Sequence, residues 1–411
     1  MTRHDLLQSR EGVAGVTGGL FLLFLLPRLF LLFGREPFYD ELFTQWIARQ
    51  SFFGIVEALR YDSGPPLYYF IVHALGLRSI TALRVFSIIC ATLALGFVLA
   101  ASNLGKARFT AALLLTLYPP FVLFSVDARA YALCALFIAI GVLLVDRGRP
   151  FAAAACLTAA AYSHFYGVLF FPLLLRPTAG SADESASAES RLPPAMRPIF
   201  ALGLAVLLFA PGLYLASIQP REAIGWLTQT QSDASHLAVF KNFSFAGRYP
   251  AALWPPAPVW LTVAAGLALL AAASRSLRFA AAVIVPIVLT LFFGLAGRRI
   301  YFPMRFESAI AIPLILWCSL SLARWRPVVQ RTLVAFLIGV GTWSAIAGIS
   351  NHLSRPLDSY RATALLAGRI TSPQDTVVAV GYCYLESLAH VRAKVIPFAP
   401  QQALHPGWRH R

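Results

Sequence analysis

Long stretches with almost no charged residues recur along nearly the whole chain, and residues 12–33, 110–126 and 259–273 are examples. A helix of about 20 apolar residues crosses the roughly 30 Å of hydrocarbon in a bilayer. Inside lipid the backbone must satisfy its own hydrogen bonds, which only helices and closed barrels do. These stretches do not alternate with period two, so we expect helices. The pattern predicts an all-α polytopic membrane protein with about eleven transmembrane helices.

The composition supports this interpretation. Of the 411 residues, 58% are hydrophobic and 13% are charged, and the mean hydropathy is +0.68. A soluble domain of this composition would have too few polar side chains to cover its surface. The first apolar stretch is too long for a signal peptide and lacks a cleavage site, so we expect it to remain as the first span. The cysteines show no CxxC spacing, so neither a disulfide framework nor a zinc site is predicted.

The distribution of basic residues predicts the orientation in the membrane. Basic loops of membrane proteins stay in the cytoplasm, and here Arg and Lys concentrate at residues 106–108, 147–149, 176–197, 275–278 and 324–331. Placing all of these in the cytoplasm puts the N-terminus inside, and the plasma (inner) membrane is the expected location. The net charge of +16 then reflects topology and anionic head groups. Membrane lipids, and not nucleic acid, are therefore the expected partners.

The same topology places the other connections on the outer side, at residues 35–78, near 127, at 219–256, at 298–307 and after about residue 350. Pro65–Leu77 is apolar but short, so we expect it to form an interfacial helix. Phe151–Leu175 has basic residues at both ends and is expected to form a hairpin that turns near Ser163–Gly167. Residues 178–194 are rich in Ser and Ala, which is typical of a flexible loop.

Two domains are expected. Residues 1–350 form the transmembrane domain, whose first outer loop carries an acidic motif, and residues 351–411 form a small α/β segment on the outer side. The elements expected in this segment are a helix at Asp358–Ile370, a strand at Thr376–Gly381, a helix at Tyr384–Val391 and a strand at Lys394–Phe398.

The first outer loop contains a pair of carboxylates. Pro37 favours the start of a helix, and Asp40 and Glu41 follow in its first turn. The next residues place Leu42, Phe43, Trp46 and Ile47 on one face, which is typical of a helix that lies in the membrane interface. Such a helix would present the carboxylates where a lipid head group meets water. Two interpretations stay open here, because acids also cap helix N-termini without any chemical role.

Further ionisable residues are expected at the same membrane surface. Asp127, Arg129 and Tyr131 lie between two spans, and charges at this depth are costly and often mark functional sites. An Asp127–Arg129 ion pair that anchors a helix end is the structural alternative. Arg298 and Arg299 are basic although their turn is placed outside, and they are either phosphate ligands or interfacial side chains. For Arg305, which is followed by an apolar span, we favour a functional role.

The remaining candidates are less specific. His164 lies at the predicted turn of the hairpin, on the same side as the acids, and is either a structural histidine or part of the site. Trp226 and Trp254 in the longer outer loop either stack on a sugar or lie in the interface. The clusters lack the His, Cys and carboxylate spacing of a metal site, so no metal is predicted.

Transfer of a sugar from a lipid phosphate requires these groups together. A base takes the proton of the acceptor, and cations stabilise the leaving phosphate. A carboxylate at the interface and outer Arg residues supply both. A site that only binds and moves an anionic lipid would contain the same groups, so the residues alone leave both functions open.

Several motifs follow one another along the chain. They are Arg28 … Phe38-Tyr-Asp-Glu-Leu-Phe, Asp62-Ser-Gly-Pro-Pro-Leu-Tyr-Tyr, Ala82-Leu-Arg-Val-Phe-Ser, Asp127-Ala-Arg-Ala-Tyr-Ala-Leu, Tyr162-Ser-His-Phe-Tyr-Gly and Pro303-Met-Arg-Phe. In this order they resemble the bacterial glycosyltransferase family 39-like proteins. These belong to the GT-C superfamily, together with the protein O-mannosyltransferases and the aminoarabinose lipid A transferases. The tail, with Asp358-Ser-Tyr-Arg-Ala before a strand, also resembles the extramembrane ending of many members.

The resemblance implies a GT-C fold with its active site at the outer face and a polyprenyl-phosphate sugar as the donor. It also implies that Asp40 is the general base and that Glu41 supports it as a second catalytic residue. Asp127 and Arg129 would line the donor phosphate pocket, with Arg305 as a further phosphate contact. Tyr131 and His164 complete the expected substrate-binding set. Members of this kind generally need no bound metal, and no cofactor is expected.

The sequence thus predicts an inverting glycosyltransferase whose acceptor is a protein, a lipid or a glycan. The alternative is a transporter or flippase of a lipid-linked sugar, which would more often show inverted repeats and broken helices. A second alternative is an inactive relative that binds lipid or scaffolds a cell-envelope complex. The presence of Asp40, Arg129 and Arg305 as one set favours the enzyme over this second alternative.

Overall fold

The computed structural model describes residues 3–60, 63–176, 193, 195–219, 243, 259–296, 300–302, 304–354, 360–380, 387 and 390–398. Five helices in this part of the chain are long and apolar enough to cross a membrane. These are α1 (Arg3–Gly34), α5 (Ile80–Ala100), α10 (Arg197–Ile218), α15 (Arg305–Leu322) and α16 (Pro327–Ser354). The expectation of an all-α polytopic membrane protein is therefore confirmed.

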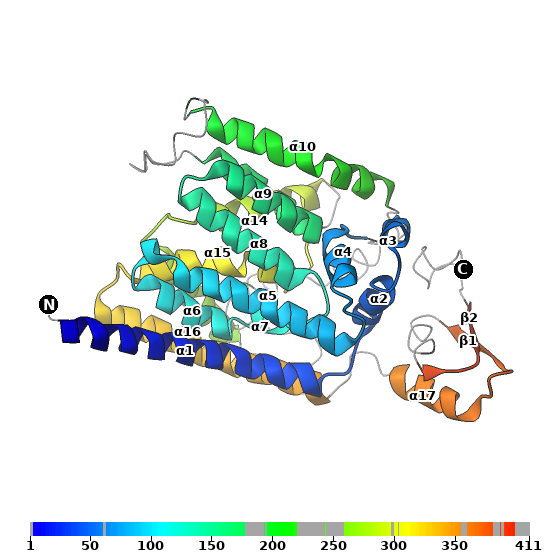
Figure 1. Cartoon of the computed structure of the whole chain (residues 1–411). Helices are drawn as coiled ribbons and strands as arrows, with labels where there is room; N and C mark the ends of the chain where they lie inside the picture. Colours follow the sequence, from blue (N-terminus) through cyan, green and yellow to red (C-terminus); the bar gives the residue numbers. More distant parts are fainter. Residues whose placement is uncertain are drawn as a thin grey trace.

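Shorter apolar helices lie alongside these five (Figure 1). They are α6 (Ala107–Leu117), α8 (Tyr131–Asp146), α9 (Pro150–Ser163), η2 (Phe165–Leu175), α13 (Val259–Ala273) and α14 (Ala281–Leu295), while η1 (Ser102–Leu104) and α7 (Pro119–Phe124) are connecting turns. Because these apolar helices fall short of a full crossing by length, the count of about eleven spans stays a prediction.

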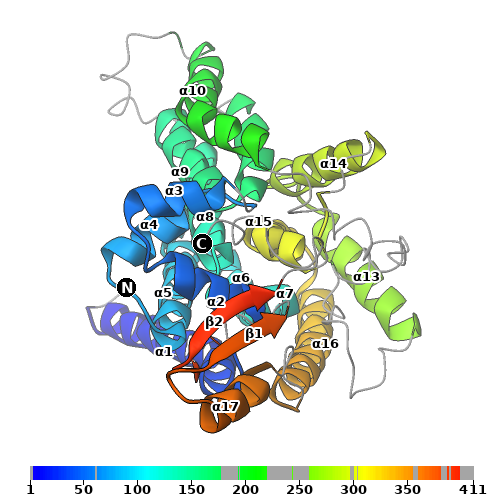
Figure 2. The same cartoon turned by 90° about the vertical axis from the view of Figure 1, so that its right-hand side faces the viewer.

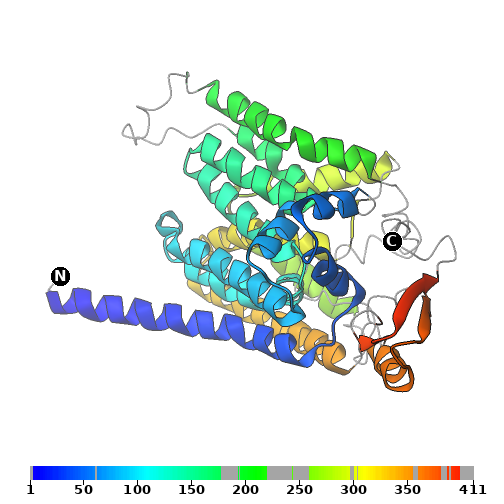
Figure 3. The ribbon, with the colours of Figure 1, turned by 45° about the vertical axis from the view of Figure 1, so that its right-hand side comes forward.

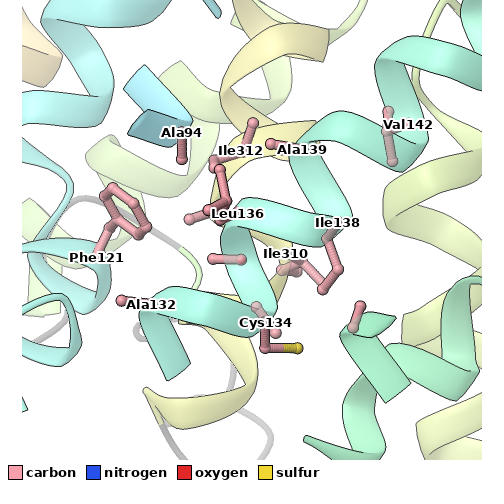
Figure 4. Packing of buried hydrophobic residues seen from close by; sticks show 14 of the residues in the cluster. Ala94, Phe121, Ala132, Cys134, Leu136, Ile138, Ala139, Val142, Ile310 and Ile312 are labelled. Atoms are coloured by element: carbon pink, nitrogen blue, oxygen red, sulfur yellow. The ribbon is translucent and has the colours of Figure 1, made fainter. Parts of the chain in front are cut away.

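The centre of the bundle is formed by α8 and α15. In α15, 83% of the membrane-length window is buried, against 28% in α1 and in α10, so α15 lies inside and those two face lipid. Small side chains such as Ala94, Ala132 and Ala139 lie among larger ones such as Ile310 and Ile312 in the core (Figure 4). Small residues at helix contacts let the backbones approach closely, as is typical of membrane bundles.

Short helices gather at one end of the bundle, which we call the α2 end. They are α2 (Tyr39–Ile47), α3 (Phe52–Leu59) and α4 (Leu67–Ala74), and α1 begins at the opposite end (Figures 1 and 3). The short helix α4 lies within the segment Pro65–Leu77 that was expected to be interfacial. The amphipathic helices thus form a layer at the ends of the spans, as their apolar faces require.

The predicted hairpin is formed by α9 and η2, which turn at His164. The turn requires a residue without a side chain, because a Cβ on Gly167 would lie 2.3 Å from the Ala161 nitrogen. Because the two backbones approach this closely, η2 packs back against α9. The tip of the hairpin lies against the start of α8, since the His164 ring is 5.4 Å from that of Tyr131.

The C-terminal elements are α17 (Tyr360–Ile370), β1 (Thr376–Val380) and β2 (Lys394–Phe398), beyond the α2 end (Figure 1). The two strands are parallel, with Thr376 opposite Lys394. Most of the expected helix at Tyr384–Val391 lies outside the described residues, as do most of the loops at 178–194 and 219–256. The domain boundary after residue 350 stays a prediction, and α16 continues to Ser354.

Candidate active site

Helix α2 begins at Tyr39, a short connection after α1 ends at Gly34, and carries both Asp40 and Glu41. Its N-cap, Phe38, has an extended backbone, and Asp40 and Glu41 occupy the first turn. The Phe38 N–H lies 3.4 Å from Glu41 Oε2, so Glu41 also caps the helix. The two carboxylates then diverge, because Glu41 is fully buried while the Asp40 side chain is 28% exposed.

Glu41 is held by two guanidinium groups. Its Oε1 accepts hydrogen bonds from Arg35 Nη2 at 2.7 Å, Arg84 Nε at 2.9 Å and the Ala128 N–H at 2.9 Å. Its Oε2 accepts from Arg84 Nη2 at 2.5 Å. Burial acts to raise the pKa of Glu41, but Arg35, Arg84 and the Ala128 N–H outweigh it and hold the pKa below its ordinary value. Glu41 is therefore ionised at neutral pH.

Asp127 belongs to the same group of charges. Arg35 Nη1 donates to Asp127 Oδ1 at 2.6 Å, and the Ser87 hydroxyl donates to the Asp127 carbonyl at 2.6 Å. Burial raises the pKa of Asp127, against the opposing effect of Arg35. We call Arg35, Glu41, Arg84 and Asp127 the buried ion cluster. Its two positive and two negative groups tie α1, α2, α5 and the turn before α8 together.

Asp40 faces the first turn of α15. Arg305 Nη2 donates to Asp40 Oδ2 at 2.9 Å, between residues 265 positions apart. The Arg305 guanidinium carbon lies 4.1 Å from the centre of the Phe302 ring and 5.5 Å from that of Tyr131. Cation–π contacts of this kind fix the plane of a guanidinium group. The Asp40–Arg305 pair is therefore oriented by aromatic rings and still partly open to solvent.

Arg129 approaches the same place from the turn before α8. Its Nη1 donates to the Tyr69 hydroxyl at 3.0 Å and lies 3.4 Å from both Thr44 Oγ1 and the Asp40 carbonyl oxygen. The His164 ring lies 5.4 Å from the Tyr131 ring and is tilted against it by 43°. Burial, with smaller contributions from Arg129 and Arg305, lowers the pKa of His164 to about 3. The structure thus brings together one carboxylate, two guanidinium groups and two rings, the residues Asp40, Arg129, Arg305, Tyr131 and His164. We call this set the surface cluster, because four of its members are partly exposed and only Tyr131 is buried.

All seven residues predicted for the site lie at the α2 end, but in two layers. Five form the surface cluster, while Glu41 and Asp127 lie in the buried ion cluster. Figure 2 looks onto this end, with α2 in front and α5, α8 and α15 behind it. Arg298, Arg299, Trp226 and Trp254 lie outside the described residues.

Sequence reasoning missed some residues of both layers. Arg84 is an ionisable residue inside the otherwise apolar stretch Ile80–Ala100, and a charge at that depth was a usable signal. Arg35 directly follows the first span and looks like an ordinary interfacial residue. Tyr69 lies in the motif Asp62-Ser-Gly-Pro-Pro-Leu-Tyr-Tyr but was given no role, and Phe302 gave no signal. The contacts of both residues depend on Arg129 and Arg305 from other parts of the chain. Among the residues that the structure describes, no group of three His, Cys, Asp or Glu side chains is arranged to hold a metal.

No protein-family model matches the sequence, and no curated protein matches it. The structure is similar to the crystal structure of ArnT from Cupriavidus metallidurans bound to undecaprenyl phosphate, with a TM-score of 0.59 and 12% sequence identity over 97% of this chain and 87% of that one. The apo structure of the same protein gives a TM-score of 0.59 and 14% identity over 96% of this chain and 87% of that one. This chain has the GT-C fold. The fold implied by the sequence motifs is thus confirmed over nearly the full length.

Proposed function

We propose that this GT-C protein is a glycosyltransferase that moves a sugar from a polyprenyl-phosphate donor to an acceptor at the outer face of the plasma membrane. The observation that carries the proposal is the Asp40–Arg305 pair, with Arg129 beside it, at the α2 end of the bundle. A base and two phosphate-binding groups at the end of membrane spans are what this reaction requires. The ArnT structure bound to undecaprenyl phosphate supports a lipid of this class as the donor.

In this proposal Asp40 takes the proton of an acceptor hydroxyl or amine. The acceptor atom attacks the anomeric carbon, the bond between that carbon and the phosphate oxygen breaks, and polyprenyl phosphate leaves with the electron pair. The sugar is transferred with inversion. Arg305 and Arg129 stabilise the negative charge that develops on the leaving phosphate, because a guanidinium group bonds two oxygens at once. Tyr131 and His164 form the aromatic wall beside them.

The buried ion cluster has a positioning role in this mechanism. Glu41 directly follows Asp40, and Asp127 is two residues before Arg129. Holding Glu41 and Asp127 in place therefore also fixes the backbone of Asp40 and Arg129. Glu41 is 0% exposed and Asp127 is 4% exposed, so both carboxylates are poorly placed to meet a substrate. Asp127, which the resemblance assigns to the donor phosphate pocket, therefore acts through Arg129 in our proposal, and Glu41 acts through Asp40.

The proposal places the N-terminus in the cytoplasm and the α2 end outside, which keeps the basic loops inside. The acceptor in this proposal is a protein, a lipid or a glycan. The C-terminal elements α17, β1 and β2 lie at the same end (Figure 3). They therefore belong to the outer side in this topology.

Transfer is tested with purified protein in liposomes, given radiolabelled sugars on a panel of polyprenyl-phosphate carriers together with extracts of envelope acceptors. The proposal predicts that one donor loses its sugar and that the label appears on an acceptor. Movement of intact donor between leaflets, without loss of sugar, would show a flippase instead. Intact donor that stays in its leaflet in every mixture would contradict both functions and leave a binding role.

A further inference from the structure

A tyrosine at the hairpin turn, Tyr166, is bonded to the backbone just before α15. Its hydroxyl donates to the Ile300 carbonyl at 2.9 Å and accepts from the Phe302 N–H at 3.1 Å. One side chain therefore joins the hairpin to a segment more than 130 residues further along the chain, with separations of 134 and 136. The Tyr166 hydroxyl therefore bonds the residues immediately before and after Tyr301, Ile300 and Phe302.

Tyr166 is itself held firmly. Its N–H donates to His164 Nδ1 at 3.2 Å, and its ring lies 4.5 Å from the His164 ring. The neighbouring Gly167 packs directly on the backbone of α9, where a Cβ would lie 2.3 Å from the Ala161 nitrogen. The Tyr166 ring also meets Phe306 edge-on, at 5.4 Å. Tyr166 therefore contacts residues on both sides of Arg305.

The backbone between these contacts has a costly conformation. Met304 has φ of 64°, in the left-handed region that a side chain with a Cβ rarely adopts. Such a conformation persists only where the surrounding structure enforces it. The next residue is Arg305, whose guanidinium stacks on Phe302 and bonds Asp40. The direction of Arg305 therefore depends on how residues 300–302 are held.

We infer that Tyr166 is a positioning residue that aims Arg305 at the reacting groups by fixing residues 300–302. The inference rests on the proposed function, since Arg305 is the phosphate ligand of that mechanism. Tyr166 does not need to touch the substrate. It acts through the backbone to which its hydroxyl is bonded, and a second bond, from the Tyr301 hydroxyl to Glu307 Oε1 at 2.5 Å, closes the same loop onto α15.

The test compares Tyr166→Phe with Tyr162→Phe. Both changes remove one hydroxyl from the same hairpin, but the Tyr162 hydroxyl donates to the Leu208 carbonyl on α10. Tyr166→Phe is expected to lower kcat for sugar transfer on the order of tenfold to a hundredfold, because two hydrogen bonds that aim Arg305 are lost. Tyr162→Phe is expected to transfer at the wild-type rate. Hydrogen exchange of residues 300–306 should become faster in Tyr166→Phe alone, because the Phe302 N–H loses its acceptor.

A double mutant separates positioning from general weakening of the fold. In the Arg305→Ala background, Tyr166→Phe should cause no further loss of transfer, because the residue through which it acts is already gone. Losses that multiply in the double mutant would overturn the inference, and so would wild-type kcat in Tyr166→Phe. If the wild type transfers no sugar, the proposed function is wrong, and hydrogen exchange alone then decides whether Tyr166 holds this segment. Hydrogen exchange in Tyr166→Phe equal to that of the wild type would also overturn the claim that Tyr166 holds residues 300–302.

Discussion

Replacing Glu41 by Gln tests whether the buried ion cluster holds the α2 end together. The change keeps the shape of the side chain but removes its charge and turns one oxygen into an NH₂ donor. The Glu41 carboxylate is fully buried between Arg35 and Arg84, so at least one guanidinium group then faces another donor. Breaking a buried ion pair from one side costs about 3–5 kcal/mol. This is a large part of a typical stability of about 5–15 kcal/mol.

The matched control is Glu57→Gln, the same substitution at an exposed carboxylate in α3. Glu57 pairs with Arg60 at 3.0 Å, with 56% of the Glu57 side chain exposed, and exposed pairs contribute about 0–1 kcal/mol. The free energy of unfolding is measured by denaturation of both variants in detergent micelles. A loss of less than about 1 kcal/mol in Glu41→Gln, equal to that in the control, would refute the account of the cluster.

The stability difference between wild type and Glu41→Gln is also expected to depend on pH. The pKa of Glu41 is lower in the folded protein than its ordinary value, so its contribution is present above the ordinary carboxyl pKa of about 4.3. This contribution is lost as the pH falls through the lower, folded-state pKa. The stability difference between wild type and Glu41→Gln should therefore be full at neutral pH and shrink under acid conditions. A difference that stays constant into acid would show that the charge of Glu41 is not what stabilises the cluster.

Two further substitutions test the surface cluster and the hairpin. Arg305→Lys replaces the planar guanidinium group by a point charge and should lower kcat/KM for transfer by about 10²–10³. Arg60→Lys, at an exposed site, is the control and should leave kcat/KM unchanged. Equal kinetics for both variants would contradict the role of Arg305. Gly167→Ala forces a Cβ to within 2.3 Å of the Ala161 nitrogen and should lower the free energy of unfolding by about 1–3 kcal/mol. Gly203→Ala, with open space around it, is the control, and equal unfolding curves for the two alanine variants would show that the turn tolerates a side chain.

The helices and the hairpin could be predicted from the sequence because their signals are local. Apolar length alone indicated α1 and α13, and basic residues at both ends of Phe151–Leu175 indicated a hairpin whose turn lies at His164. The fold class followed from the same reasoning and from the ordered motifs. The number of spans could not be predicted in this way, because helices such as α6 (Ala107–Leu117) are shorter than the membrane is thick.

The partners of the site residues could not be predicted, because packing and not sequence spacing determines them. Asp127 has an Arg two positions away, yet the structure pairs it with Arg35, which lies 92 positions earlier. Asp40 in the first turn of α2 meets Arg305 in the first turn of α15, although the two residues are 265 positions apart. The sequence indicated which residues carry charge at the membrane surface, and the structure separates them into a buried layer and a surface layer.

The role of Asp40 as the base is the central claim, and transfer by Asp40→Asn tests it most directly. The amide keeps the size of the side chain but accepts no proton, so kcat should fall by about 10²–10⁴, with the donor still bound. Glu57→Gln removes a carboxylate from the same end of the bundle and should transfer at the wild-type rate. An Asp40→Asn protein that transfers sugar as fast as the wild type would contradict the account.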